Sequence, residues 1–102
     1  MTASRGQLKA LYQADQNKYI LKILEELGEF QTALLHFLDG KVTGKELAIE
    51  LADLEIQAAK ASIFVPIDSF LQARKDQQIK FSDSVAHEYG IVIGEGTGEG
   101  EI

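Results

Sequence analysis

The sequence of 102 residues contains no cysteine, no tryptophan and only one proline. The absence of cysteine excludes disulfide bonds, thiolate zinc sites and cysteine nucleophiles. No apolar run is long enough to span a bilayer, and the N-terminal residues lack the apolar segment of a signal peptide. We therefore expect a cytoplasmic protein with no membrane partner.

Basic residues are also scarce. The chain has 10 lysines and arginines against 16 acidic residues, which gives a formal net charge of −6. This excess of negative charge opposes binding to the phosphate backbone of nucleic acids, so we expect no nucleic-acid partner. Small phosphorylated ligands stay possible, because a bound metal ion can reverse the local field.

The spacing of apolar residues predicts an all-α fold. Apolar side chains recur at the helical period, most clearly between residues 20 and 38. The expected helices cover Ser4 to Ala14, Asp15 to Leu38, Thr43 to about Phe64, and Ile67 or Asp68 to Phe81.

Particular residues mark the ends of these helices. Thr43 and Glu46 have the spacing of a capping box, which opens a helix. Gly40 is suited to end the preceding helix, and Pro66 must stop or kink the following one.

The end of the chain has a different composition. Residues 82–88 can form one more helical turn, and the run Gly90 to Gly94 has the pattern of a short strand. Residues 95–101 are rich in glycine and glutamate, and such segments stay flexible unless a partner orders them. We therefore expect one small domain at residues 1–88 and a flexible C-terminal tail at residues 89–102.

The apolar surface is larger than so short a chain can cover. The second expected helix has a wide apolar arc, and the third carries Ala, Leu and Ile nearly all round. Three or four core helices are too few to bury that surface from their own residues. We therefore expect a helical bundle that is completed by oligomerisation, as a homodimer or a homotetramer.

Two pairs of acidic residues have helical spacing. Glu26 and Glu29 are three residues apart in the second expected helix, and Glu50 and Asp53 are three apart in the third. Residues at this spacing share one face of a helix. If the two helices pack side by side, four carboxylates converge, and protons or cations must relieve their repulsion. Carboxylate oxygens suit hard cations such as Mg²⁺, so the pattern predicts a divalent-metal site between two helices.

Each pair also has an ordinary interpretation as a solvated helix face, because glutamate is a good helix former. In the third helix the acids belong to a narrow polar stripe. That stripe consists of Glu46, Glu50, Asp53, Gln57 and Lys60. Two pairs on successive helices are more specific than one pair, because an antiparallel hairpin brings Glu29 and Glu50 level.

At these residues the sequence resembles a known family. The elements Glu25-Glu26-x-x-Glu29 and Glu50-x-x-Asp53, in this order and at this separation, resemble the signature of the MazG-type nucleoside triphosphate pyrophosphohydrolases. These enzymes belong to the all-α NTP pyrophosphatase superfamily.

Other residues extend the resemblance over roughly Tyr19 to Phe81. Lys22 and the small Ala52 fit the pattern around the acids. The run Pro66-Ile-Asp68 resembles the turn into the last core helix of the family.

The resemblance implies a metal-dependent nucleotide hydrolase. Such enzymes are bundles of α-helices that assemble into dimers or tetramers and bind Mg²⁺ or Mn²⁺. They cleave an NTP or dNTP between the α- and β-phosphorus to give the monophosphate and pyrophosphate. Carried over to this sequence, the metal ligands are Glu26, Glu29, Glu50 and Asp53. Glu25 completes the implied catalytic set: it orients water, acts as a base or faces solvent.

Several basic residues are candidates for phosphate binding. Lys22 lies on the same stripe as Glu26, although it is equally suited to a surface ion pair with that residue. Further candidates in the last expected helix are Arg74, Lys75 and Lys80. Gln77 or Gln78 stands where the family usually has asparagine, which leaves catalytic competence open.

Two alternatives stay open, and this departure and the unusual tail motivate the first of them. The first is a non-catalytic protein, either a nucleotide- or metal-binding sensor or a helical assembly module. The second keeps the reaction but changes the substrate to phosphoribosyl-ATP, as in related enzymes of the histidine pathway. His36 lies two turns beyond Glu29, and we interpret it as an ordinary surface histidine.

Overall fold

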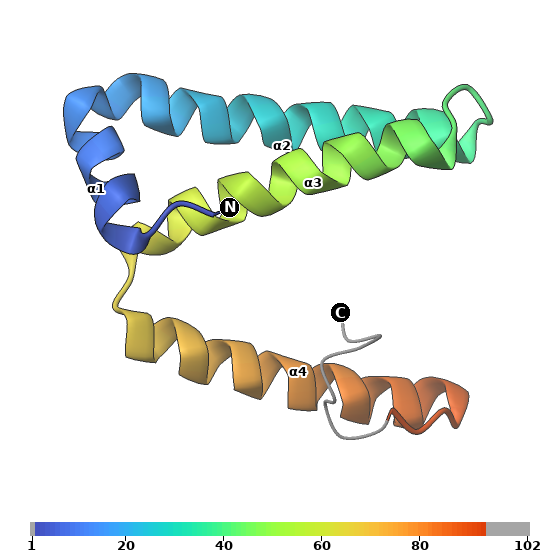
Figure 1. The fold of residues 1–102 in the computed structure, drawn as a ribbon. Helices are drawn as coiled ribbons and strands as arrows, with labels where there is room; N and C mark the ends of the chain where they lie inside the picture. The colour runs from blue at the N-terminus through green and yellow to red at the C-terminus, as the bar shows by residue number, and fades with distance from the viewer. Residues whose placement is uncertain (1, 94–102) are drawn as a thin grey trace. The chain divides into compact units, whose positions relative to one another are not determined.

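The computed structural model describes residues 2–93, which form four α-helices and one 3₁₀ turn (Figure 1). The elements are α1 (Arg5–Ala14), α2 (Gln16–Leu38), α3 (Gly44–Ala61), the 3₁₀ turn η1 (Ser62–Phe64) and α4 (Ile67–Tyr89). No strand occurs within the described residues, and the prediction of an all-α fold is confirmed. The tail predicted to be flexible lies outside the described residues from residue 94 onward.

The first two long helices form an antiparallel hairpin. Helices α2 and α3 lie side by side, and α1 packs across the open end of the hairpin against α2 and η1 (Figure 1). Short polar side chains cap the helix starts. Ser4 Oγ accepts a hydrogen bond from the Gln7 N–H at 3.1 Å, and Asp15 Oδ1 accepts one from the Lys18 N–H at 3.0 Å. Each cap satisfies a backbone donor that the helix itself leaves unpaired.

The turn between α2 and α3 follows the sequence prediction. Gly40 adopts a left-handed φ of 73°. The Lys41 N–H donates to the His36 carbonyl at 2.8 Å, and the Gly40 N–H donates to the Phe37 carbonyl at 3.0 Å. This pair of bonds is a Schellman motif, which needs a residue that tolerates positive φ. The helix therefore ends at this point because glycine, unlike other residues, adopts positive φ at little cost.

A capping box then starts α3, as predicted. Thr43 Oγ1 accepts a hydrogen bond from the Glu46 N–H at 3.1 Å, and the Glu46 carboxylate accepts one from the Thr43 N–H at 3.2 Å. These reciprocal bonds fix the first turn of α3.

Aromatic side chains and one arginine fasten α1 to the open end of the hairpin. The rings of Tyr12, Tyr19 and Phe64 pack edge to face, with centroid distances of 5.1 to 6.1 Å. The Arg5 guanidinium donates to the Ser62 carbonyl at 2.9 Å and also to the Val65 carbonyl. These bonds satisfy carbonyls at the end of the α3–η1 segment, where the helical ladder stops.

The chain divides after Val65 into two compact units, and α4 belongs to the second. The helix expected to end at Phe81 continues without a break to Tyr89, so residues 82–88, which were expected to form one more helical turn, extend this helix. Gly90, with a φ of 67°, follows its last turn. The predicted strand is wrong for residues 90–93, which have no regular structure. The predicted domain boundary after residue 88 stays a prediction.

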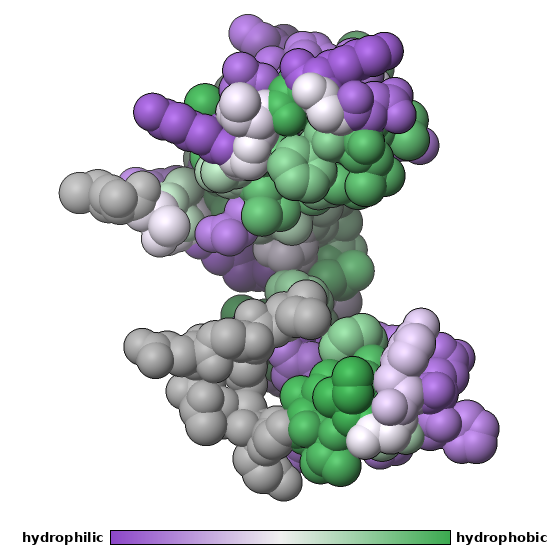
Figure 2. Space-filling view, turned by 90° about the vertical axis from the view of Figure 1, so that its right-hand side faces the viewer, coloured by the Kyte–Doolittle hydropathy of each residue, from purple (hydrophilic) through white to green (hydrophobic). Residues whose placement is uncertain are grey.

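Few side chains of the described residues are buried. Tyr19, at 3% exposure, is the only apolar side chain among them in that class, and the other three are polar: Glu26, Gln57 and Lys60. A stripe of large apolar side chains on α2 is at least 39% exposed. It consists of Ile20, Leu24, Leu27, Leu34 and Leu38. Figure 2 shows such hydrophobic residues at the surface beside hydrophilic ones. Among the described residues, no helix combines the length and apolar character that crossing a membrane requires.

Candidate metal centre

Three carboxylates from two helices meet between α2 and α3. Glu26 comes from α2, and Glu50 and Asp53 come from one face of α3. One oxygen of each carboxylate lies within 4.8 Å of the others. Glu26 is only 7% exposed, and the two residues of α3 are half-buried. The antiparallel hairpin thus brings together residues that are more than twenty positions apart in the sequence.

A second group of three carboxylates lies along α2. Glu25, Glu26 and Glu29 also have ligand oxygens within 4.8 Å of one another, because they lie within one turn of the helix. The residues implied as metal ligands therefore form two overlapping triads that share Glu26. Glu29 belongs to the triad on α2, together with Glu25, rather than to the triad that spans both helices.

A lysine neutralises part of this charge. The Lys22 ammonium lies 3.0 Å from Glu26 Oε1 and 3.2 Å from Glu25 Oε1. Its hydrogen bond lowers the pKa of Glu26, although partial burial opposes the shift. The two carboxylates in turn raise the pKa of Lys22. The ion-pair interpretation of Lys22 is therefore correct, and its predicted contact with phosphate stays a prediction.

Glu29 responds in the opposite direction. A hydrogen bond with Glu26 and the charge of that residue raise the pKa of Glu29, and the charges of Glu25 and Glu50 add to the effect. Like charges at such distances favour holding one proton between two carboxylates. Binding of a proton or a metal ion near Glu29 would therefore reduce the repulsion within the cluster.

Two buried oxygens show whether the cluster fits a metal ion. Glu26 Oε2 and Glu50 Oε2 are shielded from solvent and have no hydrogen-bond partner among the described residues. Buried acceptors without partners are costly. Both oxygens belong to carboxylates of the triad that spans the helices, and carboxylate oxygens are the ligands that Mg²⁺ and Mn²⁺ prefer. The residues present therefore fit a hard divalent cation, which Glu26, Glu50 and Asp53 would hold.

Comparisons of the chain with family models, with curated proteins and with solved structures give no match. The interpretation of the carboxylates therefore rests on the residues of α2 and α3 and on their geometry.

An open groove of about 500 Å³ adjoins the carboxylates. Its lining consists of Glu25, Gly28, Glu29, Thr32, Ala33, His36, Val42 and Glu50. A Cβ atom added at Gly28 would meet no atom within 4 Å, so this part of the groove is open space. The groove thus joins the acidic cluster to an uncharged stretch of α2. His36, interpreted from the sequence as an ordinary surface residue, lies in its wall.

Two buried polar residues of α3 were not singled out in the sequence. Gln57 is 7% exposed, and its Oε1 has no hydrogen-bond partner among the described residues. Lys60 is 8% exposed, and its ammonium lies 4.6 Å from the centre of the Tyr19 ring. Both follow Asp53 on the polar stripe that the helical period predicts. The polar stripe was the one sequence pattern that included these two residues, but such a pattern does not show whether a polar residue is buried or solvated.

The remaining candidates for phosphate binding lie in the second unit. Arg74, Lys75 and Lys80 are on α4. Arg74 lines a shallow groove along that helix between Phe70 and Phe81, together with Ala73, Gln77 and Gln78. The predicted role of the three basic residues in substrate binding stays a prediction.

Proposed function

We propose that this protein hydrolyses nucleoside triphosphates, either NTP or dNTP, at the α–β phosphate bond. The products are the nucleoside monophosphate and pyrophosphate, and the reaction depends on Mg²⁺ or Mn²⁺. The observation that supports this proposal is the triad of Glu26, Glu50 and Asp53, which places two buried, unpartnered oxygens between two helices. The resemblance to the MazG-type enzymes, which rests on the same residues, supplies the reaction.

The residues of the cluster have separate roles in this proposal. Glu26, Glu50 and Asp53 would hold the cation, which when bound would lower the pKa of water and stabilise charge at the attacked phosphorus. Glu25 and Glu29 line the groove at the edge of the triad. A carboxylate in that position can orient a water molecule and accept its proton. No protein nucleophile is required.

The groove supports a nucleotide as the substrate. Gly28, Thr32 and Ala33 make an uncharged stretch next to the acids, and such a surface suits the nucleoside part of the molecule. His36 can contact the base or sugar from the wall. The acids alone would repel the phosphates, and a bound cation would offset that repulsion.

A nucleotide panel tests the proposal. The protein is incubated with NTPs and dNTPs in the presence of Mg²⁺ or Mn²⁺, and the products are identified as monophosphate and pyrophosphate. Changing groups around metal ligands already costs about 10- to 100-fold, so Glu50→Gln and Asp53→Asn should each lower turnover by at least about 100-fold. Glu55→Gln, at an exposed carboxylate of α3, is the matched control. Orthophosphate as the only product, or full activity in both ligand variants, would contradict the proposal.

One observation favours the non-catalytic alternative. The Lys22 ammonium already occupies one side of the Glu26 carboxylate, so a protein cation partly satisfies the cluster. Calorimetry with nucleotide and Mg²⁺ separates the two readings, because a sensor binds nucleotide without consuming it. Phosphoribosyl-ATP is included in the panel as the third possible substrate.

We also propose that the protein self-associates into a homodimer or a homotetramer. The exposed apolar stripe on α2 and the exposed Ile49, Leu51 and Ile56 of α3 support this proposal, because water-exposed apolar patches of this kind mark association surfaces. A cytoplasmic location stays a prediction.

A further inference from the structure

Lys60 is buried to an extent that is rare for a lysine. Only 8% of its surface is exposed, although lysines are almost never buried unless they are paired. The ion pairs among the described residues are both made by Lys22. The Lys60 ammonium therefore pairs with no carboxylate of the described residues. Its nitrogen is not among the solvent-shielded polar atoms that lack a partner, so the buried part of Lys60 is its aliphatic stem and the ammonium stays accessible.

Tyr19 holds Lys60 at two points. Its hydroxyl donates to the backbone carbonyl of Lys60 at 2.6 Å, and the face of its ring lies 4.6 Å from the Lys60 ammonium. Tyr19 is itself only 3% exposed, so it is a fixed platform. An aromatic face attracts a cation but does not take up all of its N–H groups. The platform therefore positions the ammonium and leaves donors available to another group.

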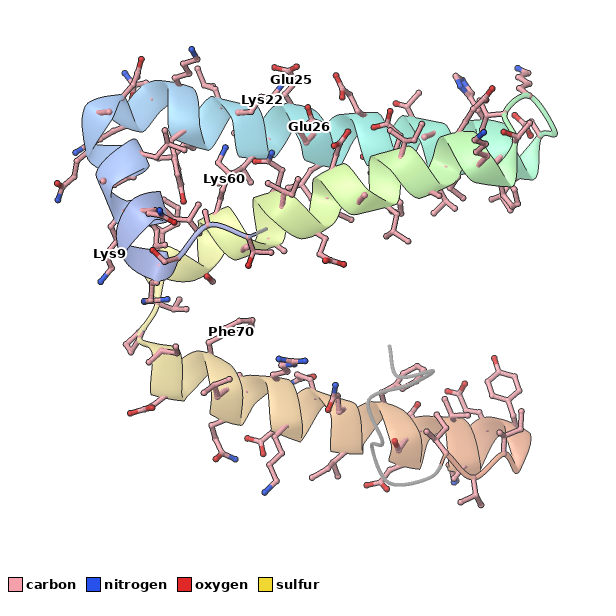
Figure 3. All side chains as sticks on the ribbon, in the orientation of Figure 1. Lys9, Lys22, Glu25, Glu26, Lys60 and Phe70 are labelled. Atoms are coloured by element: carbon pink, nitrogen blue, oxygen red, sulfur yellow. The ribbon has the colours of Figure 1, made fainter. Side chains whose placement is uncertain are left out.

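The ammonium lies on the side of α3 that faces the acidic cluster. Figure 3 shows Lys60 rising from α3 toward the stretch of α2 that carries Lys22 and Glu26. The mutual effects of the charges agree with this position. Burial lowers the pKa of Lys60, repulsion by Lys22 lowers it further, and attraction by Glu26 opposes the shift. The cluster thus has two cationic groups at the end that lies toward α1.

Gln57 supplies a second, independent observation at the same end. It lies one turn after Asp53 and one turn before Lys60, it is 7% exposed, and its Oε1 has no partner among the described residues. Beyond Glu50 and Asp53, the stripe on α3 therefore continues with a buried acceptor, Gln57 Oε1, and with the accessible ammonium of Lys60. A hydrated phosphate group can satisfy both, because its oxygens accept hydrogen bonds and its bound water donates them.

The two ends of the site differ in chemistry. Toward the α2–α3 turn, the groove is lined by Gly28, Thr32 and Ala33, which carry no charge. Toward α1, Lys60 lies two turns beyond Asp53 on the same stripe of α3, outside the lining of this groove. We propose, building on the proposed function, that Lys60 binds the terminal part of the phosphate chain, which leaves as pyrophosphate. The nucleoside then extends in the opposite direction, along the groove.

This assignment gives Lys60 a role distinct from that of the metal ligands. Its ammonium donates hydrogen bonds to the phosphate oxygens and offsets negative charge on the leaving group, as lysines do when they bind phosphate. It does not hold the cation. Removing its charge should therefore weaken pyrophosphate binding and leave binding of the metal alone intact.

Calorimetry with two probes tests the assignment on the full chain. The first probe is Mn²⁺ alone, and the second is inorganic pyrophosphate in the presence of Mn²⁺. Lys60→Met keeps an unbranched apolar stem as long as the aliphatic part of lysine and removes the ammonium. A charge-assisted hydrogen bond contributes about 1.5–3 kcal/mol, so pyrophosphate affinity should fall by about tenfold or more. Mn²⁺ affinity should stay within about threefold of the parent, and Lys18→Met, at an exposed lysine of α2, should change neither.

Pyrophosphate affinity within about twofold of the parent in Lys60→Met would overturn the assignment. If Lys60→Met does not fold, Lys60→Gln takes its place under the same criterion. Failure of both variants to fold would assign Lys60 to the support of the hairpin alone and would also overturn it. The nucleotide assay separates this inference from the proposed function. Turnover that does not depend on Lys60 would refute this inference and leave the proposed hydrolase activity standing. Pyrophosphate binding that depends on Lys60, without any turnover, would refute the hydrolase activity and leave the assignment of Lys60 standing.

Discussion

Glu26 and Glu29 lie less than one turn apart on α2, and their pKa values move in opposite directions. The hydrogen bond from Lys22 lowers the pKa of Glu26, whereas the interaction with Glu26 raises that of Glu29. The lysine therefore stabilises the ionised form of Glu26, the residue that the two triads share. Without a metal ion, the remaining repulsion between the carboxylates disfavours the ionised form of Glu29.

A Glu29→Gln variant should be more stable than the parent near neutral pH in the presence of a chelator. A carboxyl group whose pKa is raised by folding stabilises the protein below its ordinary value of 4.5, and this contribution is lost as the pH rises through the higher folded value. The melting temperature of the variant should therefore exceed that of the parent near pH 7, and the gap should close toward pH 4.5. Glu55→Gln is the exposed control, and a gap that does not depend on pH would contradict the repulsion.

The sequence identified the acids of the site but not its buried polar end. Helical spacing is a local property, so it placed Glu50, Asp53, Gln57 and Lys60 on one stripe. Whether a member of the stripe is buried depends on what packs against it. Lys60 is covered by Tyr19, which lies 41 residues away in the sequence. The division of the acids into two triads has the same origin, because it depends on how α2 and α3 are rotated about their axes.

Two glycines of the α2–α3 hairpin lie in opposite backbone conformations. Gly40 adopts a left-handed conformation to close α2, whereas Gly28 lies inside α2, where an added Cβ meets no atom within 4 Å. Gly40→Ala should therefore lower the free energy of unfolding by about 1–2 kcal/mol, the cost of a left-handed alanine. Gly28→Ala should raise it by about 0.5–1 kcal/mol, because alanine is the better helix former.

Urea unfolding of the two variants checks this prediction, and each serves as a control for the other because the chemical change is the same. Equal effects of the two substitutions would show that neither the Gly40 turn nor the helical setting of Gly28 is as described.

The elements were predictable where the sequence carries a stop or a start. Thr43 with Glu46, and Gly40, fixed both sides of the α2–α3 turn. The end of α4 was predicted too early. The helix continues to Tyr89, since residues 82–89 contain no glycine or proline that would break it before Gly90. The apolar run after it was read as a strand, but an isolated strand has no neighbour to receive its hydrogen bonds.

At the scale of the whole molecule, many large apolar side chains of the chain are exposed to solvent. Burying a leucine side chain contributes about 1.5–3 kcal/mol, and the α2–α3 hairpin leaves several such side chains exposed. Polar residues, in contrast, occupy most of the buried positions among the described residues. A bundle of more than one chain would bury the apolar stripe of α2 and leave the groove beside Glu25 and Glu29 on a different face.

Light scattering coupled to size-exclusion chromatography should therefore give a mass two or four times that of one chain. Leu24→Lys combined with Leu27→Lys should shift the mass toward one chain or lower the concentration at which the assembly dissociates, because each lysine places a charge in the apolar contact. Lys18→Glu, at an exposed lysine of the same helix, should leave the mass unchanged. A parent protein that is a single chain at all concentrations would refute association, and the apolar stripe would then need another partner.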